Sequence, residues 1–189
     1  MGIYKSLFVA LIAVFGLSAC NVNVKKNDAG QEKNVDIKTP FGELHFDKGA
    51  DVKDTGLPVY AGARLKQGDD KDDKRANVNI ATSAFGLKVV AVDYESDDAP
   101  AKLIAYYKDQ LKRYGTVLEC RSSGSNFSAN YGRDKDSEQL KCEGDNAGKT
   151  VELKAGTRTN QHIVSIEPRD KGSEFALVYV KMRGQEGTI

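Results

Sequence analysis

The sequence has no tryptophan, only two histidines and only three cysteines among 189 residues. It also lacks the glycine motifs of nucleotide-binding loops, G-x-x-x-x-G-K-[ST] and G-x-G-x-x-G, and the H-E-x-x-H zinc motif. No serine stands in a G-x-S-x-G turn, and no carboxylate pair has a context that marks acid–base catalysis. The sequence therefore predicts a protein that is not an enzyme and that has no cofactor or metal site.

Excess charge of one sign is absent as well. The whole chain has 28 basic and 27 acidic residues, and removal of Lys5 with the N-terminal segment leaves 27 of each. No long basic run is present, so the electrostatic footprint of a nucleic-acid partner is missing. Only one long apolar run occurs, from Leu7 to Leu17. It is shorter than the about 20 residues needed to span a bilayer.

Residues 1–19 have the pattern of a cleaved secretory signal, with Lys5 ahead of the apolar run. Leu17-Ser18-Ala19-Cys20 follows directly and resembles the lipobox of bacterial lipoproteins. The resemblance implies a diacylglyceryl group on Cys20, cleavage before it, and usually an acyl chain such as palmitate on the new amino terminus. Two alternatives are an ordinary signal peptide without lipid and N-myristoylation of Gly2. The lipobox interpretation is favoured because a myristoyl group would not need the apolar run behind it.

The mature chain divides into a tether and one domain. Residues 20–34 are polar with few apolar side chains, which predicts a lipidated flexible tether. Residues 35–189 are long enough for a single domain with a real core. Asn21 stands where some sorting systems recognise an aspartate for inner-membrane retention, so the outer membrane is favoured over the inner membrane.

Hydrophobic periodicity predicts an α+β fold. One amphipathic helix is expected over about 98–114, because Asp and Pro residues mark its start and apolar residues recur at helical spacing: Leu103, Tyr107, Leu111 and Tyr114. That stripe is interpreted as the face that packs on a sheet rather than as an aromatic binding face. Strands are expected over 35–39, 43–46, 76–81, 87–94, 116–121, 138–143, 150–155, 162–167 and 175–182. The simplest arrangement is one antiparallel sheet of about six to eight strands with the helix on one face.

Cys120 and Cys142 lie in two strand-like stretches that a hairpin would place side by side. Because thiols oxidise outside the cytoplasm, we predict a disulfide between them. A redox or metal pair is the alternative, but redox cysteines usually stand two residues apart and zinc needs more ligands. The segment between them, 122–137, is expected to be a polar loop.

Two polar segments have compositions that could form binding sites. The aspartates of 69–73 do not fit a calcium loop, because the required glycine and glutamate are missing in both possible registers. A cationic and hydroxyl-rich turn is the better candidate for binding an anion such as a phosphate or a sugar carboxylate, although an exposed β-turn has the same composition: Lys154, Thr157, Arg158, Asn160 and His162.

Three short motifs accompany the lipobox: Thr39-Pro40-Phe41-Gly42, Gly56-Leu57-Pro58-Val59-Tyr60-Ala61-Gly62-Ala63 and Leu103-Ile104-Ala105-Tyr106-Tyr107-Lys108. Together they resemble a group of uncharacterised bacterial envelope lipoproteins, in which proline often stands at the position of Ala61. The resemblance implies an envelope location and transfers no catalytic residue. We therefore expect a membrane-anchored, non-catalytic protein that binds or supports another envelope component. A small-molecule or anion-binding module is the alternative, and a hydrolase with an unrecognised site is the third hypothesis.

Overall fold

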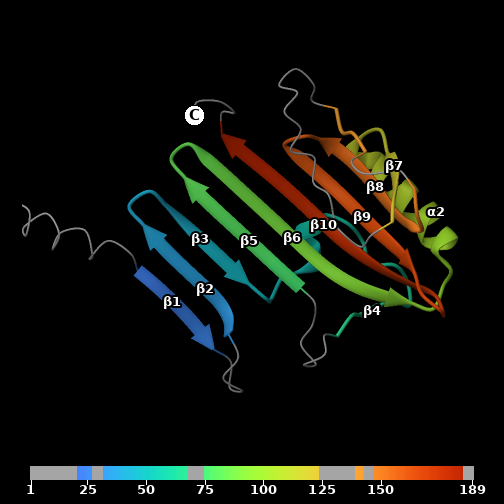
Figure 1. Cartoon of the computed structure of the whole chain (residues 1–189), viewed down its shortest axis with the longest axis horizontal. Coiled ribbons are helices and arrows are strands. Elements are labelled where there is room, and N and C mark those ends of the chain that lie inside the picture. The colour runs from blue at the N-terminus through green and yellow to red at the C-terminus, as the bar shows by residue number, and fades with distance from the viewer. Residues whose placement is uncertain (1–20, 27–31, 68–74, 124–138, 143–146, 185–189) are drawn as a thin grey trace, which may run out of the picture.

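The computed structural model describes residues 21–26, 32–67, 75–123, 139–142 and 147–184. Within these ranges the chain forms one ten-stranded antiparallel sheet with one α-helix on one face (Figure 1). The elements in chain order are β1 Asn21–Lys26, β2 Glu32–Thr39, β3 Gly42–Asp47, η1 Val52–Thr55, β4 Arg64–Leu65, β5 Arg75–Thr82, β6 Phe85–Ser96, α2 Pro100–Leu111, η2 Lys112–Tyr114, β7 Leu118–Ser122, β8 Thr150–Thr157, β9 Asn160–Pro168 and β10 Ser173–Gly184.

The strand order is β1-β2-β3-β5-β6-β10-β9-β8-β7, with β4 paired to the side of β6. Short turns join β2 to β3, β5 to β6 and β8 to β9, as expected for antiparallel neighbours. The α+β class is therefore confirmed, while the expected number of six to eight strands is too low. The strands that were not expected are β1 and the two-residue β4.

Two local predictions are wrong for identifiable reasons. Residues 21–26 and 32–34 form strands instead of a flexible tether, because their backbone pairs with the neighbouring hairpin. Residues 139–142 are not in a strand, and Cys120 lies opposite Glu152 of β8. A hairpin between the two cysteine stretches therefore does not form, although the sulfur atoms do bond.

The helix α2 begins at Pro100 and continues through η2 to Tyr114, close to the expected range. Its stripe of Leu103, Tyr107 and Leu111 is buried against β8 and β9, so the packing interpretation is confirmed. Asp98 does not cap the helix. Its carboxylate instead contacts Lys102 and accepts a hydrogen bond from the Tyr60 hydroxyl at 2.9 Å.

Tyr107 is the largest fully buried side chain of the core between the helix and the sheet. Its hydroxyl accepts a hydrogen bond from the Tyr60 N–H at 3.1 Å and donates one to the Pro58 carbonyl at 3.3 Å. The ring also lies 5.6 Å from that of Phe175 of β10. The helix is thereby joined both to the sheet and to the segment that precedes β4.

Candidate interaction surface

The two faces of the sheet differ in chemistry, because successive side chains of a strand point to opposite sides. We call the face that α2 covers the helix face and the opposite one the open face. On the open face, the strand registers align two continuous rows of apolar residues across six strands. The first row is Val24, Val35, Phe46, Val78, Val89 and Val180, and the second is Val22, Ile37, Leu44, Ile80, Leu87 and Met182.

The row between these two points to the helix face and is polar throughout: Asn23, Asp36, His45, Asn79, Lys88 and Lys181. Within it, the His45 imidazole contacts the Asp36 carboxylate. On the β1–β5 side of the sheet the apolar surface thus lies opposite to the layer that holds the helix.

The helical elements pack at the other half of the molecule. The helix α2 contacts β8 and β9, and η1 contacts β6 and β10 (Figure 1). At the edge of the open face, Val22 is 60% exposed and Val24 is 38% exposed, while Ile37, Leu44, Val78 and Ile80 are half-buried. The rows end in a buried apolar cluster of Ile163, Val178 and Val180 on β9 and β10. The open face is therefore a broad apolar surface that extends outward from a packed centre.

One end of the sheet gathers exposed aromatic and basic side chains. Phe41, in the β2–β3 turn, is 85% exposed, and Phe85, after the β5–β6 turn, is 42% exposed. Because Asn21 pairs with Lys38 beside the first of these turns, β1 starts at this same end. The nearby cations are Lys38, which pairs with Glu43 at 3.3 Å, Lys88, Lys181 and Arg183. We call this region the turn end.

The structure does not bring the predicted anion-binding residues together. Lys154 is fully buried on the open face, where its Nζ lies 3.1 Å from Glu152 Oε2, whereas His162 points to the helix face. Thr157 and Asn160 are exposed at the β8–β9 turn, and Arg158 beside them is buried. The Arg158 backbone carbonyl accepts a hydrogen bond of 2.8 Å from the side-chain amide of Gln161.

His162 makes contacts that stabilise the fold. Its Nδ1 donates a hydrogen bond to the Thr55 carbonyl at 2.8 Å, and the Tyr114 ring stacks on the imidazole with 3.5 Å between centroids. Burial lowers the pKa of His162, which keeps the ring neutral and therefore suited to donate from one nitrogen only. The Tyr114 hydroxyl also donates to the Gly56 carbonyl. Together these groups hold η1 and the helix end against β9.

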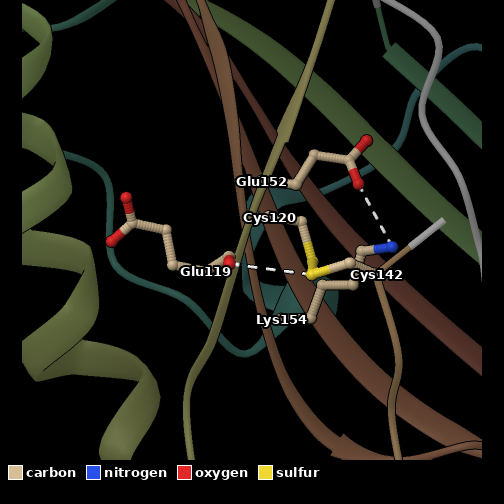
Figure 2. Close-up of a disulfide and its surroundings, with 5 residues drawn as sticks. All are labelled: Glu119, Cys120, Cys142, Glu152 and Lys154. Carbon is tan, nitrogen blue, oxygen red and sulfur yellow. Dashed lines mark hydrogen bonds and ion pairs between the residues drawn. A yellow bond between two sulfur atoms is a disulfide. The ribbon is translucent and has the colours of Figure 1, made fainter. Parts of the chain in front are cut away.

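The disulfide between Cys120 and Cys142 is present and joins β7 to residues 139–142 (Figure 2). Figure 2 shows the buried Glu152–Lys154 ion pair beside it. Both residues belong to β8, and removing either one would leave an uncompensated buried charge, which costs about 3–5 kcal/mol. The nearby Glu119 points to the helix face, where Lys108 of α2 contacts its carboxylate and lowers its pKa.

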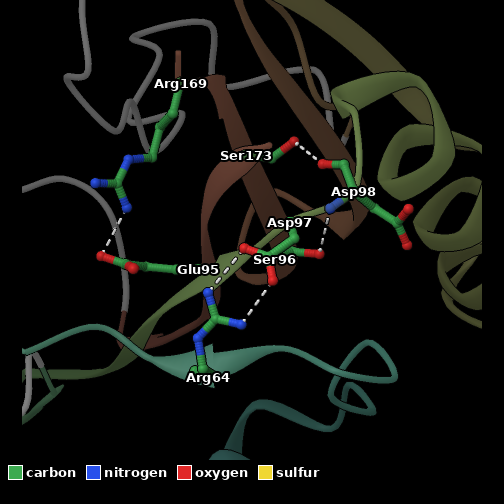
Figure 3. A network of polar contacts seen from close by, with 7 residues as sticks. All are labelled: Arg64, Glu95, Ser96, Asp97, Asp98, Arg169 and Ser173. Carbon is green, nitrogen blue, oxygen red and sulfur yellow. Dashed lines mark hydrogen bonds and ion pairs between the residues drawn. The ribbon is translucent and has the colours of Figure 1, made fainter. Parts of the chain in front are cut away.

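A second polar network closes the other end of the sheet (Figure 3). Arg64 forms two hydrogen bonds of 2.9 Å with Asp97, and the guanidinium holds the pKa of that carboxyl below its usual range. Arg169 lies 2.7 Å from Glu95, and Ser173 donates to the Asp98 carbonyl at 2.8 Å. Arg64, Glu95, Asp97 and Arg169 line a cavity of about 460 Å³, in which both of these carboxylates pair with arginines. The network connects β4 and the β9–β10 turn to the end of β6.

Within the ranges that the structure describes, no group of three or more His, Cys, Asp or Glu side chains could hold a metal ion. No described helix is long and apolar enough to cross a membrane. Cys20 and the expected signal segment 1–19 lie outside the described residues. The open face was missed at the sequence level, although the alternation Asn21-Val22-Asn23-Val24 carries its signal.

No family model, no curated protein and no solved structure matches this chain.

Proposed function

We propose that this chain is a lipid-anchored, non-catalytic protein of the bacterial envelope that uses its open face to hold a protein partner. The observation that carries the proposal is the pair of apolar rows across six strands. A contiguous apolar patch favours an interaction site, since the largest apolar patch on a monomeric soluble protein is often functional. The absence of charged residues from both rows favours a partner that presents an apolar, uncharged surface.

The composition of the turn end supports the proposal that the protein is anchored to a membrane. The lipobox cysteine immediately precedes Asn21, the first residue of β1, so lipid on Cys20 would lie next to the turn end. Exposed phenylalanines insert favourably at the bilayer interface, and basic side chains are attracted to anionic headgroups. Phe41, Phe85 and the cations of the turn end thus have the composition that this position requires.

The contacts of the titratable groups support a structural rather than a catalytic role. Asp97 is held by Arg64, Glu119 by Lys108 and Glu152 by Lys154. His162 donates its proton to a backbone carbonyl and stacks on a tyrosine. Asp97, Glu119 and His162 each join two elements of the fold, whereas Glu152 is neutralised by Lys154 within β8.

The anchor is tested on the full chain with Cys20→Ser as the comparison. We expect the wild-type protein to remain in the membrane pellet after a carbonate wash, and mass spectrometry of its N-terminal peptide to show acyl chains on Cys20. The Cys20→Ser protein is expected to leave the pellet. A wild-type N-terminal peptide with an unmodified Cys20 would overturn the lipid anchor.

The contact surface is tested with single new thiols on opposite faces of β5. Ile80→Cys places a thiol on the open face, and Asn79→Cys places one on the helix face of the same strand. In intact envelopes we expect a maleimide polymer to react with Ile80→Cys at least about tenfold more slowly, whereas both thiols should react alike after unfolding in urea. Similar rates in the folded protein would show that the open face is not covered.

A further inference from the structure

We propose that the partner on the open face is a second copy of this chain, packed sheet against sheet within the same membrane. The inference rests on the proposed contact surface and names its occupant. Two copies related by a two-fold axis present the same patch to each other, so the patch must complement itself. Each apolar row meets this condition without any matching of charge signs, because neither row contains a charged residue.

The geometry of the strands is compatible with two anchors in one bilayer. Sheets that pack face to face keep their strand directions within about 30° and lie about 10 Å apart. A two-fold axis along the strands and normal to the membrane satisfies this and leaves both turn ends on the membrane side. Both β1 strands then start at the bilayer, where the lipid on each Cys20 would lie.

The small size of the patch indicates that two copies would pair stably only when both are anchored in one membrane. Six strands at ~4.8 Å spacing and two rows ~7 Å apart give a projected patch of roughly 400 Å² per copy. Two copies bury roughly 800 Å² of projected surface, which is the range of weak interfaces in solution. Confinement of both copies to one membrane raises their effective concentration and favours association. We therefore expect pairing in the envelope and dissociation on dilution in detergent.

The rows also offer a matched pair of positions for the test. Val78 lies at the middle of the first row between Phe46 and Val89, and Asn79 follows it on the helix face. Val78 is half-buried and Asn79 is exposed, so a bulky probe at either position leaves the core between α2 and the sheet unchanged.

The experiment uses the full chain in its own membrane, in cells that produce two differently tagged copies. A photo-reactive benzoylphenylalanine replaces Val78 in one protein and Asn79 in another. Illumination of whole cells is expected to give an adduct of twice the mature mass carrying both tags from position 78, and none from position 79. With the benzoylphenylalanine at position 80 on the same face, Val78→Lys should abolish the doubly tagged adduct, whereas Asn79→Lys should leave its yield unchanged.

Three results would overturn the inference. An adduct from position 78 with a different protein, and none with a second copy, would leave the proposed contact surface standing but assign it another occupant. Equal self-adducts from both positions would place the contact between copies elsewhere. No adduct from either position would contradict both the pairing and the proposed contact surface.

Discussion

Replacing Tyr107 with phenylalanine removes one oxygen atom from the centre of the core and leaves the ring in place. That hydroxyl accepts from the Tyr60 N–H at 3.1 Å and donates to the Pro58 carbonyl at 3.3 Å. Burial raises the pKa of Tyr107 far above its ordinary value, consistent with a hydroxyl that water does not reach freely. The Tyr107→Phe variant therefore loses two hydrogen bonds while its apolar packing is conserved.

The expected cost follows from the groups that are left behind. A buried donor or acceptor without a partner costs about 1–3 kcal/mol, and both backbone groups here are only partly buried, so we expect a loss of about 2 kcal/mol. In a domain of this size, 1 kcal/mol corresponds to a change in melting temperature of about 2–4 °C, and the predicted decrease is about 4–8 °C. Urea unfolding followed by far-ultraviolet circular dichroism measures the free energy, with an unchanged slope as the check on two-state behaviour.

Tyr106 provides the matched control, since its ring packs edge-on against both Tyr60 and Tyr107 and this packing survives the substitution. We expect Tyr106→Phe to change the free energy of unfolding by less than about 0.5 kcal/mol. A Tyr107→Phe variant that is as stable as the wild type, or as stable as this control, would refute the role assigned to the buried hydroxyl.

Three further predictions concern other joints of the fold. Gly56 (φ +71°) and Gly62 (φ +78°) both have left-handed backbones, but a Cβ on Gly56 would lie 2.7 Å from the Tyr114 hydroxyl whereas one on Gly62 meets nothing within 4 Å. Gly62→Ala should lower the free energy of unfolding only by the backbone strain, about 1 kcal/mol. Gly56→Ala should lower it measurably more, as urea unfolding would show. Equal losses in the two variants would contradict the close contact at Gly56. Because burial lowers the pKa of His162, the unfolded chain takes up its proton first, so this residue's contribution to stability is complete above about pH 6.5 and is lost as the pH falls below that value. The difference in unfolding free energy between pH 7.5 and 5.5 should therefore shrink in His162→Asn, and an unchanged difference would argue against a neutral buried imidazole. The double substitution Cys120→Ser and Cys142→Ser opens a loop with a sequence separation of 22 and should cost about 3 kcal/mol, a loss that reduction of the wild-type protein should reproduce.

The helix and the sheet class could be predicted from the sequence because each has a clear period. Leu103, Tyr107 and Leu111 recur at helical spacing and pack as that spacing predicts. The disulfide was also predictable, because the envelope location expected from the lipobox left two cysteines with one obvious pairing. Its structural setting was not, since Cys120 pairs in the sheet with Glu152 instead of with the other cysteine stretch.

The open face was harder to predict because it depends on register between strands that are far apart in the chain. Composition favoured a tether over 20–34, and the alternation of Val22 and Val24 was too short to oppose it. Only pairing of β1 with β2 brings these valines into line with Val78 and Ile80. Polar composition predicts disorder only when no neighbouring strand is available for the backbone to pair with.

Sheet pairing also explains why two residues of the expected anion site lie apart. Lys154 and His162 are close in sequence, and proximity in a turn favoured a common site. Sheet pairing places His162 opposite Ala155, one residue beyond Lys154, and this single step directs the two side chains to opposite faces. The cationic group is then balanced internally by Glu152.

The start of β1 has a mechanical consequence. An acylated Cys20 would make Asn21 the point at which any force on the anchor enters the domain. Such a pull runs along the axis of β1, so the hydrogen bonds between β1 and β2, from Asn21 opposite Lys38 to Lys25 opposite Asn34, share the load at once. Antiparallel strands that are loaded in this shear direction resist extension better than strands that are peeled apart one bond at a time. Strain on the anchor would therefore load the β1–β2 pairing in shear before it reached the rest of the sheet.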